Sequence, residues 1–271
     1  MKLSFSPCPN DTFIFHAMLH GLIDVEGLTF EVHIADVEEL NMQAFAGKAD
    51  ITKLSYAACA YVADSYLVVD AGSALGRGNG PLLVARHKGA PSECERVAIP
   101  GKYTTAAFLM RSAFPMIHHY EERLFSEISQ AVNEGEVDAG VLIHESRFTY
   151  KDLNLRLLAD LGAIWEERTG LPIPLGCIAV SRDLSPDVQE RFARVMQRSV
   201  KYALNNPLKS RTFVKQHSQE LSDVVIDRHI SMFVNANTVS LGTEGRTAVM
   251  FLMNEAVKKG LISSLPERIF L

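Results

Sequence analysis

The residues with the clearest chemical potential lie around His144, at the end of the segment Gly-Glu-Val-Asp-Ala-Gly-Val-Leu-Ile-His over 135–144. The apolar part of this segment is too short and too β-branched for a helix, so it predicts a buried strand that ends at His144. Ligands of open α/β sheets bind beyond the carboxyl ends of strands. An imidazole has an ordinary pKa near ~6.5 and can accept a proton at neutral pH, so His144 is a candidate general base. A core or capping histidine is the structural alternative.

Two further polar residues end a second predicted strand, in the run Thr-Lys-Leu-Ser-Tyr over 52–56. Lys53 has the charge to hold a substrate carboxylate, and Ser55 can donate a hydrogen bond to the same ligand. The structural alternatives are an ion pair of Lys53 with Asp50 or another nearby acid, and a helix N-cap at Ser55. The sequence leaves both interpretations open.

A turn over residues 7–12 is predicted to lead from the first strand into a helix. Asn10, Asp11 or Thr12 can cap this helix, and two prolines stiffen the turn around Cys8. The N–H groups of a first helical turn lack acceptors within the helix, so such a terminus favours an anion. A well-capped helix without a ligand explains the same pattern.

A second predicted helix, over residues 106–114, begins after the turn Pro-Gly-Lys-Tyr-Thr-Thr over 100–105. Thr104 or Thr105 is placed to cap it. The small side chain of Ala106 leaves the backbone N–H groups of the first turn open to a ligand. The start of this helix is therefore a candidate place for a ligand.

Two weak internal repeats occur in the same order in the two halves of the chain. The segment from Gly47 to Leu54 matches the segment from Gly135 to Leu142 at an offset of 88 residues, with Asp50 on Asp138. Upstream, the first strand with Thr12 and Phe15 matches 97–100 with Thr105 and Phe108 at an offset of 93. Repeats in the same order at similar offsets predict two similar α/β lobes.

The lobes are predicted to be joined by ordered crossings. We place the first, discontinuous lobe at 1–92 and 204–271 and the second at 93–203. The glycine-rich loop 76–81 lacks a P-loop ending and fits a hinge or a close-packed turn. Residues 165–176 are read as a Pro/Gly connection and Asn235 as a cap. Strands are predicted at 2–6, 28–34, 82–86 and 177–180, and helices at 37–46, 187–205 and 246–259.

Composition excludes several functional classes. The net charge of −5 over 271 residues gives no basic footprint for nucleic acid. No run of about 18 apolar residues exists to span a membrane, and Pro7 interrupts the N-terminus before a signal core can form. Four scattered cysteines show no zinc or redox spacing and fit reduced thiols. We therefore expect a cytoplasmic protein with a small-molecule partner, with no nucleic-acid or membrane partner and with an oligomeric state that the sequence does not give.

Three motifs carry a resemblance to a known family. They are Ser-Pro-Cys-Pro-Asn-Asp-Thr-Phe at 6–13, Thr-Lys-Leu-Ser-Tyr-Ala-Ala at 52–58 and Ile-His-Glu-Ser-Arg-Phe-Thr-Tyr at 143–150. Together they resemble the 1,4-dihydroxy-6-naphthoate synthase family of menaquinone biosynthesis, over essentially the whole chain. The resemblance implies a bilobed α/β fold of the periplasmic-binding-protein-like type (type II), with a ligand cleft between the lobes.

The resemblance also implies a reaction and its residues. The family is a lyase of the futalosine route that cleaves cyclic dehypoxanthinylfutalosine without metal or organic cofactor, releasing a three-carbon dihydroxyacetone fragment. The substrate is a small-molecule carboxylate. His144 matches the family's proton acceptor, and the matching substrate contacts are Lys53, Leu54, Ser55, Thr105 and Ala106.

Three other readings compete with this one. The same fold serves small-anion binding proteins, in which His144 would only contact the ligand. A sibling enzyme that dehydrates chorismate is less similar in the runs at 6–11 and 143–147. A Cys8 nucleophile at a helix start has no base partner that the sequence identifies.

Overall fold

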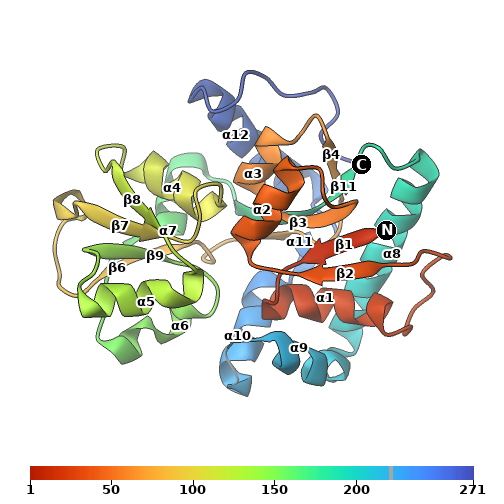
Figure 1. The fold of residues 1–271 in the computed structure, drawn as a ribbon, viewed down its shortest axis with the longest axis horizontal. Coiled ribbons are helices and arrows are strands. Elements are labelled where there is room, and N and C mark those ends of the chain that lie inside the picture. The colour runs from red at the N-terminus through yellow and green to blue at the C-terminus, as the bar shows by residue number, and fades with distance from the viewer. Residues whose placement is uncertain (220–221) are drawn as a thin grey trace. The chain divides into compact units, whose positions relative to one another are not determined.

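Each of two units of the chain is built around its own mixed β-sheet (Figure 1) in the computed structural model, which describes residues 1–219 and 222–271. Unit 1 consists of Met1–Gly76 and Pro174–Leu271, and unit 2 of Arg77–Ile173. Within the described residues, no helix combines the length and apolar character needed to cross a membrane.

The sheet of unit 1 has the strand order β2-β1-β3-β11-β4, and β5 pairs with β11. Helices α1 and α8 pack together on one face, with α2, α3 and α12 on the other (Figure 1). Its strands are β1 (Lys2–Phe5), β2 (Glu31–Ile34), β3 (Ile51–Ser55), β4 (Tyr66–Val68), β5 (Ala74–Gly76) and β11 (Ile173–Ser181). Its main helices are α1 (Pro9–Leu19), α2 (Val37–Phe45), α3 (Tyr56–Tyr61), α8 (Pro186–Asn205), α9 (Arg211–His217), α10 (Asp223–Phe233), α11 (Ala236–Val239) and α12 (Gly242–Lys258).

The sheet of unit 2 has the order β10-β6-β9-β7-β8. Helix α5 packs against β9, and α4 packs with α7. The strands are β6 (Leu82–Ala85), β7 (Arg96–Ile99), β8 (His119–Glu122), β9 (Ala139–Leu142) and β10 (Arg156–Asp160). The helices are α4 (Thr105–Ala113), α5 (Phe125–Glu134), α6 (Ser146–Thr149) and α7 (Leu161–Thr169).

The predicted internal repeat is confirmed in detail. In each unit a central strand (β1 or β7) has two parallel neighbours, and the second of these (β3 or β9) pairs with an antiparallel strand. The Asp50 carboxylate accepts a bond from Lys2 N, and the Asp138 carboxylate accepts one from Arg96 N, both over 2.8 Å. The two aspartates therefore fix the start of the equivalent strand in each unit.

The unit boundaries differ from the predicted ones (1–92, 93–203 and 204–271). Strand β6 pairs with β9 and β10 of unit 2, so this unit begins before residue 92. Strand β11 pairs with β3 and β4 of unit 1. The apolar stripe of α8, which includes Phe192 and Met196, packs into the core of unit 1 with Phe5 and Phe15. The chain therefore returns to unit 1 near residue 174 rather than 204.

Two local expectations were wrong. Residues 165–176 are not a Pro/Gly connection throughout, because α7 runs to Thr169, ends at Gly170 in a left-handed conformation, and β11 begins at Ile173. The Asp160 carboxylate caps this helix by accepting bonds from Gly162 N and Ala163 N. Strand β2 is also shorter than the predicted strand at 28–34, beginning at Glu31.

A close approach of two glycines supports unit 2 and confirms a close-packed turn in the loop 76–81. A Cβ on Gly80 would lie 2.3 Å from Gly162 Cα, a backbone atom that cannot move aside. We expect Gly80→Ala to lower the free energy of unfolding by roughly 1–3 kcal/mol, as overpacking does. Chemical denaturation measures this effect. Gly170→Asn is the control. A Cβ at Gly170 would meet no atom within 4 Å apart from its chain neighbours, and Asn tolerates a positive φ.

His16, on α1, gives a pH dependence of stability. Burial, followed by the nearby His20, lowers the pKa of His16 below its ordinary value of 6.5. The unfolded chain therefore binds more protons between pH 6.5 and the lower folded-state pKa, and the free energy of unfolding falls as the pH drops through this window. We expect His16→Leu to weaken this dependence, measured by denaturation at pH 7.5 and 5.5. If the free energy of unfolding of His16→Leu changed with pH as much as that of the wild type, the pH dependence would come from other groups.

Candidate functional site

The predicted residues Lys53, Leu54 and Ser55 lie at the carboxyl end of β3. Strand β3 is a parallel neighbour of β1, so the carboxyl ends of both strands share one edge of the unit 1 sheet. All three residues are buried, with Lys53 6% exposed. This edge is where α/β sheets bind ligands.

Lys53 forms a buried ion pair with Asp11, an acid that the sequence did not suggest as its partner. Its Nζ lies 2.5 Å from Asp11 Oδ1, and Asp11 is fully buried. Among the described residues, Asp11 is the one acidic partner of Lys53, so Asp50 is not. The pair uses one of the three N–H donors of the ammonium. The other two donors are not used by Asp11, and a carboxylate can accept hydrogen bonds from them.

Asp11 does not cap helix α1, contrary to expectation. The helix begins earlier, with Pro9 as its first residue and Cys8 as N-cap without a side-chain cap bond. The other Asp11 oxygen, Oδ2, accepts from Ser6 Oγ over 2.7 Å and from Ser6 N over 3.3 Å. The sequence placed Asp11 in the right turn but could not show that it faces Lys53.

Gly176 on β11 leaves room for the lysine side chain. It lies opposite Ser55 in the antiparallel register. A Cβ at this position would approach Lys53 Cε and Leu54 O to 3.0 Å each. A side chain here would therefore press on the ammonium stem and on the strand that carries it.

Ser55 is oriented by Asn41 of α2, which the sequence analysis missed. Ser55 N donates to Asn41 Oδ1 over 3.0 Å, and Asn41 Nδ2 lies 3.3 Å from Ser55 Oγ. Ser55 is the N-cap residue of α3 but makes no side-chain cap bond. Its hydroxyl therefore accepts from Asn41 and keeps its own proton for another acceptor. The signal available in the sequence was a polar residue, Asn41, on the helix face that otherwise carries Val37, Leu40 and Ala44.

The predicted contacts of unit 2 share an edge in the same way. Strands β7 and β9 are parallel neighbours, so the start of α4 after β7 and His144 after β9 lie beyond the same sheet edge. Thr104 caps α4 by accepting from Ala107 N over 3.1 Å. Thr105 and Ala106 are buried in the first turn of this helix, 2% and 4% exposed.

His144 follows β9, as predicted, in a conformation that the sequence did not predict. Its φ is 52°, in the left-handed region that few residues other than glycine adopt. Its ring makes an edge contact with Phe125, at 4.9 Å between centroids. The chain turns here into α6 at Ser146, so the strand does not continue through Glu145. Backbone strain of this kind concentrates at functional sites.

The loop 76–81 packs beside this turn within unit 2. Gly78 N donates to Glu166 Oε1 over 2.7 Å, and the Arg147 guanidinium donates to Gly78 O over 3.3 Å. Burial lowers the pKa of Arg147 from its usual value, although Asp160 opposes the shift. Arg147 therefore carries a partly desolvated positive charge close to His144 in the sequence.

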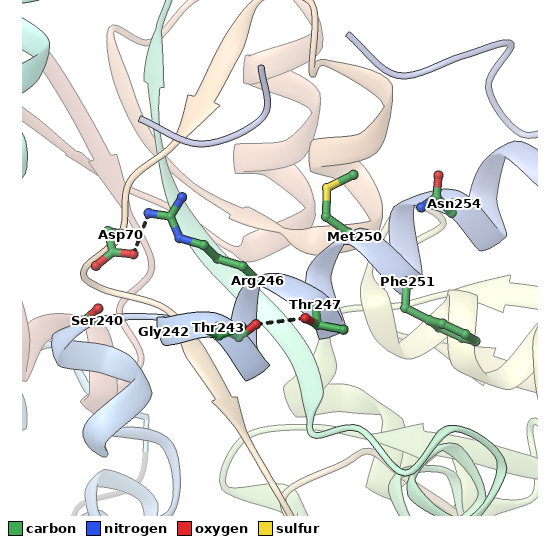
Figure 2. Close-up of a pocket in the computed structure, with 9 residues that line it drawn as sticks. All are labelled: Asp70, Ser240, Gly242, Thr243, Arg246, Thr247, Met250, Phe251 and Asn254. Carbon is green, nitrogen blue, oxygen red and sulfur yellow. Dashed lines mark hydrogen bonds and ion pairs between the residues drawn. The ribbon is translucent and has the colours of Figure 1, made fainter. Parts of the chain in front are cut away.

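A groove of about 760 Å³ lies elsewhere on unit 1, along α12 from Gly242 to Asn254 (Figure 2). Arg246 points to Asp70 there and donates to its carboxylate over 2.9 Å. The guanidinium also lies 4.7 Å from the Phe270 ring centre. None of the six predicted site residues lines this groove.

The predicted cap at Asn235 is confirmed, because its Oδ1 accepts from Asn237 N at the start of α11. None of the four cysteines forms a disulfide, and Cys8 is buried. Within the part of the chain that the structure describes, no cluster of three or more His, Cys, Asp or Glu side chains is placed to hold a metal ion.

Known proteins resemble this chain over its whole length. A family described as menaquinone biosynthesis matches residues 1–258. The 1,4-dihydroxy-6-naphthoate synthase of Thermus thermophilus is 46% identical over 270 residues, covering 100% of this chain and 98% of that protein.

Solved structures share the fold. Protein AF1704 of Archaeoglobus fulgidus has a TM-score of 0.90 at 38% identity, covering 96% of this chain and 98% of its own. The Candida albicans CA3427 product, described as having the periplasmic binding protein fold, has a TM-score of 0.70 at 13% identity and covers 98% and 92% of the two chains. The predicted periplasmic-binding-protein-like α/β fold is therefore confirmed.

Proposed function

The chain belongs to the 1,4-dihydroxy-6-naphthoate synthase family of menaquinone biosynthesis, and we propose that it is the lyase that cleaves cyclic dehypoxanthinylfutalosine. The products are 1,4-dihydroxy-6-naphthoate and a three-carbon dihydroxyacetone fragment, on the futalosine route. The reaction takes place in the cytoplasm and uses no metal or organic cofactor.

The observation that carries the proposal is the position of His144 at the end of β9, in a strained left-handed conformation. A retro-aldol-like cleavage needs a base that removes a hydroxyl or C–H proton as the carbon–carbon bond breaks. The imidazole of His144 takes that role. Such a base typically contributes ~10²–10⁴-fold to the rate. Formation of the aromatic naphthalene ring supplies driving force that the protein need not provide.

The remaining predicted residues bind and orient the substrate. Lys53 donates to the substrate carboxylate from an ammonium that Asp11 holds in place. Ser55 donates its hydroxyl proton, because Asn41 already donates to its oxygen. Leu54 contributes to the same strand end, and the first-turn N–H groups of Thr105 and Ala106 stabilise negative charge that develops on oxygen.

The test is turnover of cyclic dehypoxanthinylfutalosine by the purified protein after treatment with a chelator. We expect 1,4-dihydroxy-6-naphthoate and dihydroxyacetone in equal amounts, measured by chromatography and mass spectrometry. The same result is expected for Cys8→Ala, since the mechanism assigns Cys8 no role. Binding of the substrate without product would favour a small-anion binding protein. Product formation from chorismate instead would favour the sibling dehydratase.

A further inference from the structure

A buried chain of hydrogen bonds runs from helix α10 to the ammonium of Lys53. His229 Nε2 lies 2.9 Å from Asn10 Oδ1, and Asn10 Nδ2 donates to Asp11 Oδ1 over 2.8 Å. Lys53 Nζ donates to the same Asp11 oxygen. His229 and Asp11 are fully buried, and the other two residues are at most 6% exposed. We propose that His229 is a positioning residue for Lys53, acting through Asn10 and Asp11.

The direction of each bond fixes the proton on His229. Asn10 must present its Nδ2 group to the carboxylate, because the opposite orientation would place an amide oxygen against Asp11 Oδ1. Asn10 therefore presents Oδ1 to His229, and an amide oxygen can only accept. It follows that His229 Nε2 carries a proton and donates it to Asn10.

Lys53 needs this support because its own stem is flexible. A lysine ammonium sits on four rotatable carbons, so its direction is set by the groups that it contacts. Asp11 is that group, and its carboxylate is fixed on one side by Ser6 and on the other by Asn10. Without the His229 donor, a buried Asn10 oxygen loses its partner, and rotation of the amide removes a donor from Asp11.

A packing role for His229 makes a different prediction. Its ring lies 4.7 Å from that of Phe233 on the same helix, so it also fills space in the core. If filling space were its whole role, leucine would replace it at least as well as glutamine. If the donor matters, glutamine replaces it better, because its Nε2 can offer an N–H to Asn10.

The experiment compares His229→Leu, His229→Gln and the control His16→Leu, a buried histidine of α1 outside this chain. This inference rests on the proposed function, because Lys53 is taken as a substrate contact. We expect His229→Leu to raise the KM for cyclic dehypoxanthinylfutalosine roughly tenfold, as loss of a buried hydrogen-bond partner does. The kcat should change little, because carboxylate binding is shared by the ground and transition states. His229→Gln and His16→Leu should stay close to the wild type in KM.

Two results overturn the inference. One is an unchanged KM in folded His229→Leu, and the other is the same KM increase in His229→Gln as in His229→Leu. Calorimetric titration with 2-naphthoate tests the role of His229 separately from the proposed function, because it measures carboxylate binding and needs no turnover. If the wild type does not cleave the substrate, the proposed function fails. The inference then stands if 2-naphthoate binds roughly tenfold more weakly to His229→Leu, with His229→Gln restoring the affinity, and falls if the three proteins do not differ.

Discussion

His144→Asn is expected to lower kcat by roughly 10²–10⁴-fold, the usual contribution of a general base. Asparagine cannot accept a proton at neutral pH, but it tolerates the left-handed backbone that His144 adopts. The fold should therefore survive while the proton acceptor is lost. Steady-state kinetics with cyclic dehypoxanthinylfutalosine measures the effect, and thermal denaturation verifies that the variant is folded.

The control for His144→Asn is His119→Asn, which removes an exposed histidine from β8 of the same unit. It should leave kcat unchanged. His144→Ala is less informative alone, because alanine adds backbone strain at a positive φ to the loss of the base. A folded His144→Asn with wild-type kcat would remove His144 from the mechanism while leaving the reaction itself in place.

The repeat and the strand ends were predictable because they depend on local patterns. The segment from Gly47 to Leu54 and its counterpart from Gly135 to Leu142 have turn glycines, a structural aspartate and an apolar run in fixed order. Each feature acts within a few residues, so the sequence predicts the strand and the position of His144 after it. The left-handed φ of His144 was not predictable, because it depends on how the turn packs against its surroundings.

The unit boundaries and the partner of Lys53 depend on contacts distant in the sequence. Strand β6 looks the same in sequence whether it joins the first sheet or the second, and only its pairing with β9 decides. The sequence suggested Asp50 or another nearby acid for Lys53, whereas the partner in the structure, Asp11, is 42 residues away. Asp50, which is nearer in the sequence, instead accepts a hydrogen bond from Lys2 N at the start of β1. The pairing of β1 with β3 brings Asp11, which follows β1, close to Lys53.

Substitutions of Asp11 and Lys53 are expected to be strongly non-additive in stability. The double substitution should lower the free energy of unfolding by far less than the sum of the two single substitutions. Asp11→Asn leaves a buried ammonium without its counter-charge, and Lys53→Met leaves a buried carboxylate without its own. Each should lower the free energy of unfolding by roughly 3–5 kcal/mol, the usual cost of breaking a buried ion pair. In the double variant no charge is left uncompensated, so its loss should be close to that of one single variant or smaller.

The control is the i,i+4 pair of Asp187 and Arg191 on α8, with the side chains 73% and 30% exposed. The same substitutions there should couple by only ~0.3–0.5 kcal/mol, the usual value for such helix pairs. Denaturation by urea at low and high salt measures both cycles. Because buried charges are screened far less than exposed ones, salt should weaken the coupling of the surface pair and leave that of Asp11 and Lys53 nearly unchanged. Additive losses for Asp11→Asn and Lys53→Met would mean that the two side chains act independently, and the ammonium would then need another anchor at the end of β3.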